Sequence, residues 1–171
     1  KTPVLALEGD MGWCPPEVNQ RINQIRFWCR LNGFEPDRIV GRIFKIEVNK
    51  NKCLSWVGKM KDLFLQNNLH HLLTVGRLSK YKLKIECKNA RKILMSSYVS
   101  RWYELLHNDE RSNPLAKNKL RTYRKFKSSF HVEPHLIYPI APKYRSAFSK
   151  FRCGVAPINI ELYRYKNGAY V

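Results

Sequence analysis

Residues 117–127 read KNKLRTYRKFK, and this stretch indicates both the fold class and the kind of partner to expect. Six of its eleven residues are lysine or arginine, and none is acidic. Leu120, Tyr123 and Phe126 recur among them at a spacing that places them on one face of an α-helix. The stretch therefore predicts a helix with one narrow apolar face and a broad cationic face.

Carboxylates are distant from this stretch along the chain, the nearest being Glu110 and Glu133. We therefore expect the cationic face to stay unneutralised within the fold and to meet a polyanion. A lysine-rich helix face is also a common solvated surface, so the choice between the two interpretations depends on the rest of the chain.

The composition of the chain favours the interpretation that the cationic face binds a polyanion. The 171 residues are 44% hydrophobic, enough to bury a core in one domain or two small packed domains. The formal charge is +19 and the pI is about 10.0, which destabilises a compact chain by self-repulsion unless a polyanion offsets it. Residues 1–70 carry 11 Lys/Arg against 7 Asp/Glu, and residues 71–171 carry 21 against 6. The binding surface is therefore expected in the C-terminal part, with nucleic acid as the first candidate.

The five cysteines are widely spaced and form no Cys-x-x-Cys pair, so neither a disulfide framework nor a zinc site is predicted, and a reducing compartment is expected. No apolar run approaches the roughly 18 residues that a membrane span needs. The chain starts at a lysine rather than a methionine, so we expect it to be a piece of a longer protein.

Apolar residues at helical spacing predict six helices. They cover residues 17–31, 37–48, 54–67, 79–107, 117–127 and 141–153, and alternation at the end of the second leaves a strand possible there. Residues 5–16 are expected to be an irregular entry, and three prolines predict an extended connector over residues 134–142. The predicted fold class is all-α, an irregular bundle of about five to seven helices with little or no strand. Residues 1–107 form its helical N-terminal part, residues 108–118 a polar linker, and residues 119–171 a basic helical C-terminal part.

Catalytic patterns are scarce. The sequence contains no Gly-rich phosphate loop, no His-Glu-x-x-His and no nucleophile elbow. The string HVEPH at residues 131–135 begins like a zinc deaminase signature, but the Pro-Cys-x-x-Cys half is missing. We therefore predict no catalytic residue, no metal ligand and no cofactor.

Several stretches resemble, in order, one segment of animal non-LTR (LINE-type) retrotransposon polyproteins. They are LALEGDMGW (5–13), IRFWCRL (25–31), LRTYRKFK (120–127), YRS (144–146) and FRCGVAPINIE (151–161), followed by RY at 164–165. In those polyproteins the segment lies downstream of the reverse-transcriptase domain. The string ELYRY at residues 161–165 departs from the family's Glu-x-Gly-Arg-Tyr, so a glycine-dependent turn is not carried over.

The resemblance implies an accessory, non-catalytic part of an RNA-directed DNA polymerase, acting in the nucleus and cytoplasm beside the upstream reverse-transcriptase domain. Together with the charge pattern it predicts a phosphate-binding track for RNA or DNA, on which Tyr123 could also stack a base. The predicted site residues are Lys117, Lys119, Arg121, Tyr123, Arg124, Lys125, Lys127, Arg145, Lys150, Arg152, Lys80, Lys84, Lys88 and Arg91.

Two other interpretations stay open. The helices could form a protein-interaction scaffold that docks on the polymerase, with the basic face meeting an acidic protein surface. Alternatively, a host could have adopted the segment as a protein that binds DNA or an anionic membrane surface.

Overall fold

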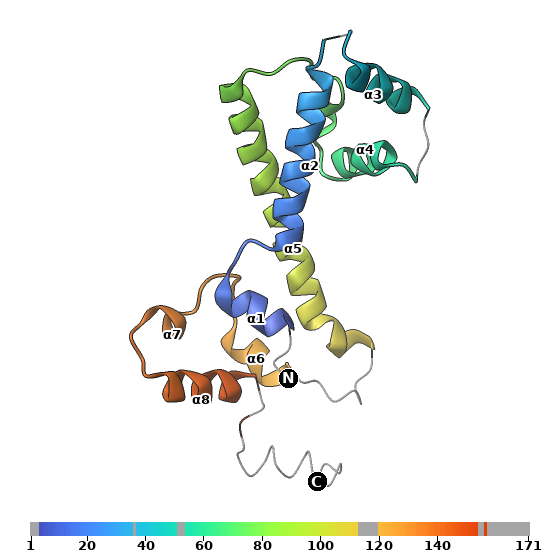
Figure 1. Ribbon diagram of the computed structural model, residues 1–171. Helices are drawn as coiled ribbons and strands as arrows, with labels where there is room; N and C mark the ends of the chain where they lie inside the picture. Colours follow the sequence, from blue (N-terminus) through green and yellow to red (C-terminus); the bar gives the residue numbers. More distant parts are fainter. Residues whose placement is uncertain (1–3, 36, 51–53, 113–119, 154–155, 157–171) are drawn as a thin grey trace. The chain divides into compact units, whose positions relative to one another are not determined.

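The structure is a computed structural model that describes residues 4–35, 37–50, 54–112, 120–153 and 156 (Figure 1). Within these ranges every regular element is helical and no strand occurs, which confirms the all-α fold class. The elements are α1 (Val4–Met11), α2 (Pro16–Asn32), α3 (Ile39–Asn49), α4 (Trp56–Gln66), the 3-10 helix η1 (His70–Leu73), α5 (Lys80–Ser112), α6 (Arg121–Phe126), α7 (Pro134–Ile137) and α8 (Pro142–Arg152).

Four of the predicted helices match α2, α3, α4 and α8 to within about two residues at most ends. The segment left open between helix and strand is the helix α3. Two predictions of non-helical structure are wrong. The expected irregular entry contains α1, and the expected extended connector contains α7, a single turn that begins at Pro134, where the missing N–H of proline costs no hydrogen bond. These additions bring the α-helices of the described residues to eight, beyond the five to seven predicted.

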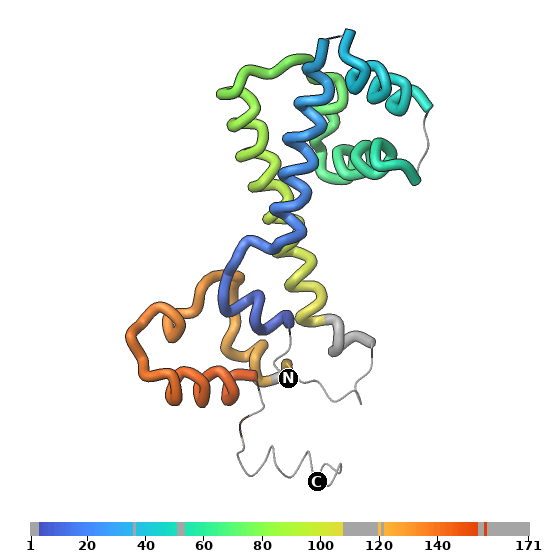
Figure 2. Tube along the Cα trace, viewed as in Figure 1, coloured from blue at the N-terminus to red at the C-terminus, as the bar shows by residue number. Residues whose placement is uncertain are grey.

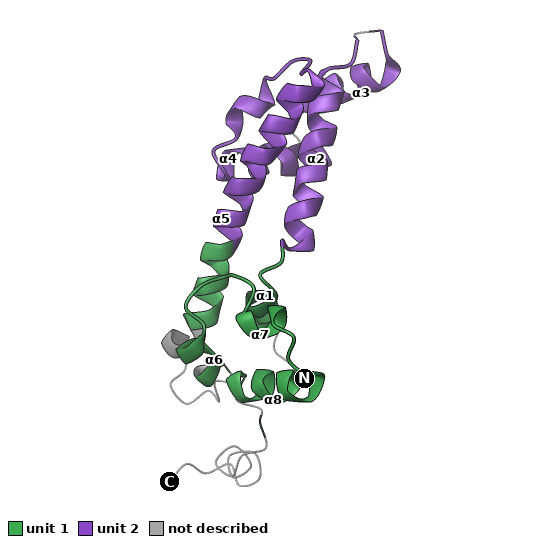
Figure 3. Ribbon diagram, turned by 90° about the vertical axis from the view of Figure 1, so that its left-hand side faces the viewer, with its two compact units in different colours: residues 1–13, 99–171 green, residues 14–98 purple. Residues whose placement is uncertain are grey.

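The chain forms two compact units (Figure 3). Unit 1 comprises residues 1–13 and 99–171, and unit 2 comprises residues 14–98. The long helix α5 contributes residues to both units. The units therefore do not follow the predicted boundary at residues 108–118. Residues 108–112 of that predicted linker are the last turn of α5, and its remainder lies outside the described residues.

Trp28 on α2 is the centre of the core of unit 2. Its indole is 1% exposed, and its Nε1 donates a hydrogen bond to the carbonyl oxygen of Leu72 at 3.0 Å. The rings of Phe44 on α3 and Phe64 on α4 meet it edge to face, with centroids 5.0 and 5.3 Å away. One buried tryptophan thus links α2, α3, α4 and η1, which explains why the predicted apolar face of α2 is buried.

In unit 1 the N-terminal helix α1 lies beside the segment that runs from α6 to α8 (Figure 2). Trp102 on α5 donates a hydrogen bond from Nε1 to the carbonyl oxygen of Leu5 at 2.8 Å. Gly9 permits this close approach, because a Cβ atom there would meet the ring of Trp102 and lie 2.5 Å from Oη of Tyr123. A helix that the sequence did not predict is therefore part of the core of unit 1.

Candidate nucleic-acid interface

One face of α5 in unit 2 carries predicted cations in a row. Lys80, Lys84, Lys88 and Arg91 are all exposed. Steps of four, four and three residues place them along the same side of a helix, about 6 Å apart along the axis for each four-residue step. The helix starts where Ser79 Oγ accepts a hydrogen bond from the backbone N–H of Lys82 at 3.2 Å. These cations therefore cluster on one exposed surface, as the sequence predicts.

No acid among the described side chains forms an ion pair with this basic face of α5. Glu86 is the one acid among residues 80–98, and its carboxylate lies 3.1 Å from Nε2 of His71. Arg91 donates a hydrogen bond to Sγ of Cys14 at 3.2 Å rather than to a carboxylate. The first turn of α5 contains no acid either, so its lysines oppose the helix macrodipole at a cost of a few tenths of a kcal/mol each. The arrangement favours an external anion.

The stretch at 117–127 is placed differently from the prediction. Lys117 and Lys119 lie outside the described residues, as does the side chain of Arg121. Tyr123 is 0% exposed and Lys127 is 3% exposed, so neither can contact a nucleic acid on the surface. Arg124 is half-buried, and Lys125 is exposed. Of the cations predicted on this helix, Lys125 is therefore the one that is exposed among the described side chains.

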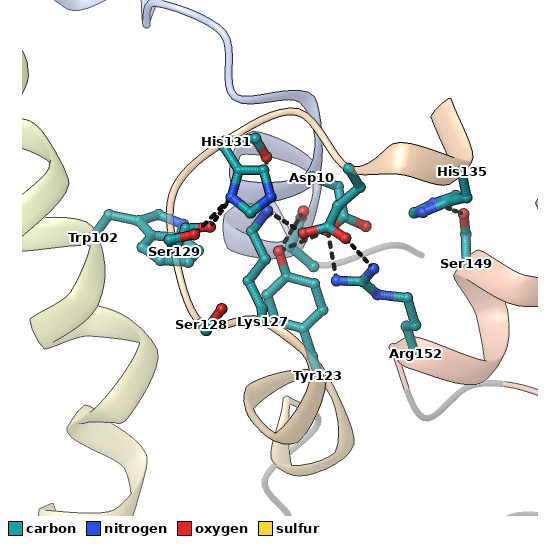
Figure 4. Close-up of polar contacts among 12 residues, drawn as sticks. Asp10, Trp102, Tyr123, Lys127, Ser128, Ser129, His131, His135, Ser149 and Arg152 are labelled. Atoms are coloured by element: carbon teal, nitrogen blue, oxygen red, sulfur yellow. Dashed lines mark hydrogen bonds and ion pairs between the residues drawn. The ribbon is translucent and has the colours of Figure 1, made fainter. Parts of the chain in front are cut away.

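Tyr123 and Lys127 belong to a buried polar cluster that joins α1, α6 and α8 (Figure 4). Glu133 is the acceptor at its centre, binding Nζ of Lys127 at one carboxylate oxygen and Nη1 of Arg152 at the other. Arg152 also lies 3.3 Å from Oδ1 of Asp10 through Nη2. We call Asp10, Tyr123, Lys127, Glu133 and Arg152 the internal charge cluster.

The Tyr123 hydroxyl completes this cluster. Its oxygen lies 3.0 Å from Oδ1 of Asp10 and 3.1 Å from the carbonyl oxygen of Ala6, so its single proton has two acceptors. Burial, followed by the charge of Asp10, raises the pKa of Tyr123 far above the normal range, which keeps the hydroxyl protonated. Tyr123 is therefore a hydrogen-bond donor in the core of unit 1 rather than a stacking platform.

Charge pairing sets the protonation of Glu133. Burial alone raises its pKa, but the hydrogen bonds and charges of Arg152 and Lys127 outweigh burial and lower the pKa from 4.5 to about 2. For Arg152, burial lowers the pKa, and the hydrogen bond to Glu133 with the charge of Asp10 outweighs it and raises the pKa. Glu133 and Arg152 are therefore both ionised at neutral pH and compensate each other inside the fold.

These contacts correct the expectation that no carboxylate neutralises the basic stretch. Glu133, six residues beyond Lys127, is one partner, and Asp10 is brought in from the far end of the sequence by α1. Arg152, which the sequence predicts on the surface, is buried with them. Asp10 lies within the LALEGDMGW stretch, but nothing in the sequence indicated that Asp10 pairs with Arg152. The short separation between Lys127 and Glu133 was the one available signal.

The remaining predicted residues lie on α8. Lys150 is exposed, whereas Arg145 is half-buried and donates a hydrogen bond from Nη2 to the carbonyl oxygen of Ile140 at 3.1 Å. They belong to unit 1, and the basic face of α5 belongs to unit 2. The exposed residues of the predicted site thus belong to two surfaces, each described within its own unit.

The histidines of the HVEPH string do not face one another across a shared ligand. His131 Nδ1 lies 2.7 Å from Oγ of Ser129, and His135 Nε2 lies 3.3 Å from Oγ of Ser149. Burial lowers the pKa of His135, so it is neutral at pH 7. Among the described residues, no three His, Cys, Asp or Glu side chains gather as metal ligands would. The described helices also include none with the length and apolar character of a membrane span.

Comparisons with protein families, with characterised proteins and with solved structures found no match to this chain.

Proposed function

We propose that this chain is a non-catalytic nucleic-acid-binding segment, accessory to the reverse transcriptase of a LINE-type retroelement polyprotein. It would hold template RNA, an RNA–DNA hybrid or target DNA through phosphate contacts, in the nucleus and cytoplasm. The observation that carries the proposal is the basic face of α5, on which Lys80, Lys84, Lys88 and Arg91 are exposed, while Glu86, the one acid of residues 80–98, lies 3.1 Å from His71. The sequence resemblance supports the retroelement context.

The geometry suits phosphates more than base edges. Flexible lysines about 6 Å apart along an axis are close to two steps, about 6.8 Å, of one DNA strand. Lysine presents a point charge with rotatable donors, which tolerates any base sequence. We therefore expect binding with little sequence preference and a strong dependence on salt concentration.

The salt dependence provides the test. If six phosphates are engaged, the log-log slope of the binding constant against salt should be about −5 on duplex and about −4 on single strands. The variant K80A/K84A/K88A should flatten the duplex slope by about 3. A matched control, R42A/K45A/K59A, removes the same charge from exposed positions of α3 and α4 in the same unit and should leave the slope almost unchanged. Equal flattening by both variants would assign binding to net charge, and no binding by the wild type at low salt would end the proposal.

A second candidate function, the protein-interaction scaffold, is favoured by α3. This helix leaves Ile39, Val40, Ile43 and Ile46 exposed, an apolar surface that suits a partner protein better than a phosphate chain. Under this function the variant I39S/I43S/I46S would abolish binding to the upstream reverse-transcriptase domain and leave oligonucleotide binding intact. Unchanged binding to that domain would exclude α3 as the docking surface.

A further inference from the structure

Helix α8 places some of its polar side chains against the rest of unit 1. Arg152 binds Glu133, and Ser149 contacts His135. Tyr144, Phe148 and Phe151 on the same helix are 61%, 45% and 42% exposed, and Phe148 also meets the ring of His135 edge to face, with centroids 4.9 Å apart. Steps of four and three residues place these three rings along one face. The helix thus leaves much of this aromatic face exposed to solvent.

The aromatic face extends onto α6. The ring of Phe126 is half exposed, and its centroid lies 5.8 Å from that of Phe151. Along α8 the rings span about 10 Å, close to the rise of three stacked nucleotides at about 3.4 Å each. Four exposed rings on adjacent helices form a contiguous apolar surface, which is typical of a binding site.

Charge identifies what this aromatic face binds. Residues 121–152 contain eight Lys/Arg and a single acid, Glu133, whose carboxylate is already bound by Lys127 and Arg152. Nζ of Lys143 lies 4.9 Å from the centroid of the Tyr144 ring. Lys125 and Lys150 are exposed on the same two helices. The partner must therefore combine negative charge with flat apolar groups.

We propose that the aromatic face of α8, with Phe126, stacks the unpaired bases of single-stranded nucleic acid while the neighbouring lysines hold its phosphates. Single strands present both chemistries at once, and proteins that bind them combine cations with stacking rings in this way. A duplex keeps its bases stacked on each other, so its base faces are not available to the rings. The proposal rests on the proposed function and specifies the single-stranded form as the ligand of unit 1.

A pair of matched probes separates stacking from charge. One is oligo-dT of about 16 nucleotides, and the other is an abasic oligomer of the same length, with the same phosphates and no bases. The wild type should bind oligo-dT more tightly, by about 5- to 150-fold for each ring that stacks a base. The variant Tyr144→Leu should lose part of this advantage, and Y144L/F148L/F151L should lose most of it, with abasic binding unchanged.

Two features keep the test decisive. The Tyr144 side chain is largely exposed, so Tyr144→Leu should leave the fold intact even if the triple variant does not, which circular dichroism checks. Trp13→Leu is the control, since Trp13 is an exposed ring of unit 1 outside α8 and should affect neither probe.

Each contrary result has a distinct meaning. Equal wild-type affinity for both probes, or variants that bind oligo-dT as the wild type does, would overturn the stacking proposal and leave phosphate binding by the chain intact. Loss of oligo-dT binding in Trp13→Leu would also overturn the assignment to α8. Loss of binding to anionic phospholipid vesicles in Tyr144→Leu, with oligonucleotide binding unchanged, would assign the face to a membrane surface. No binding of either probe by the wild type would overturn the proposed function as well.

Discussion

Lys127 and Glu133 form an ion pair inside unit 1, although Lys127 belongs to the most basic stretch of the chain. Arg152 binds the other oxygen of the same carboxylate. Part of the excess positive charge of the C-terminal region is therefore structural and is balanced within the fold. The cations that remain exposed are the ones available to a ligand.

The variant Glu133→Gln should destabilise unit 1 strongly. It keeps the size of the side chain but leaves Lys127 and Arg152 buried without the central negative charge, and breaking such a pair costs about 3–5 kcal/mol. Urea unfolding followed by tryptophan fluorescence measures the change. The control Glu17→Gln removes a solvent-exposed pair with Arg21 and should cost about 0.5 kcal/mol or less. Equal effects of the two variants would contradict the burial of the cluster.

Acid should destabilise the chain over a defined range. The pKa of Glu133 is about 2 in the fold and 4.5 as its ordinary value, so between these pH values the unfolded state binds more protons than the folded state. The stabilisation, about 3 kcal/mol, is complete above pH 4.5 and is lost as the pH falls towards 2. Urea unfolding of the wild type and of Glu133→Gln from pH 6 to 2 should show a smaller loss in the variant.

Lys125 and Lys127 offer a contrast between an exposed and a buried cation two residues apart. Lys125→Ala should change stability by less than about 0.5 kcal/mol and reduce the salt slope of oligonucleotide binding by about 1. Lys127→Ala removes a buried partner of Glu133 and should cost about 3–5 kcal/mol. Thermal melting and salt titration of both variants check this. If Lys127→Ala is as stable as Lys125→Ala, Lys127 is not a buried partner of Glu133.

The variant Tyr123→Phe should lose about 1–3 kcal/mol, because Asp10 and the carbonyl of Ala6 lose their buried donor while the ring stays in place. The comparison is Tyr103→Phe, in which a more exposed hydroxyl stops donating to the carbonyl oxygen of Ser128 and water can replace it. That change should cost less. Chemical denaturation measures both, and a neutral Tyr123→Phe would show that its hydroxyl is not a buried donor.

Gly9→Ala should be destabilising although alanine is the better helix former by about 1 kcal/mol. The new methyl group meets the ring of Trp102 and lies 2.5 Å from Oη of Tyr123, and such overpacking costs about 1–3 kcal/mol. Gly76→Ala is the control, since no heavy atom lies within 4 Å of a Cβ there. Melting temperatures should fall for Gly9→Ala alone.

Local pattern predicted most of the helices because it depends only on neighbours in the chain. The apolar spacing of α2 and the proline and glycine near its ends are examples. The apolar spacing did not predict α1, because the apolar residues of this helix do not gather on one face. The helix is stabilised instead by Trp102 and Tyr123, which come from distant parts of the sequence. For α8, the apolar spacing identified a helix but did not show which of its side chains the rest of the fold covers.

The sequence by itself determined the helical class, the excess of positive charge and the row of cations on α5, since each depends on composition or on spacing within one helix. Only the tertiary structure decided which charges are paired and which aromatic rings are exposed. Lys127 and Arg152 became internal, and Tyr144 and Phe148 external, because long-range packing brings Glu133 and Asp10 to one place and orients α8 around them. No pattern of nearest neighbours contains that information.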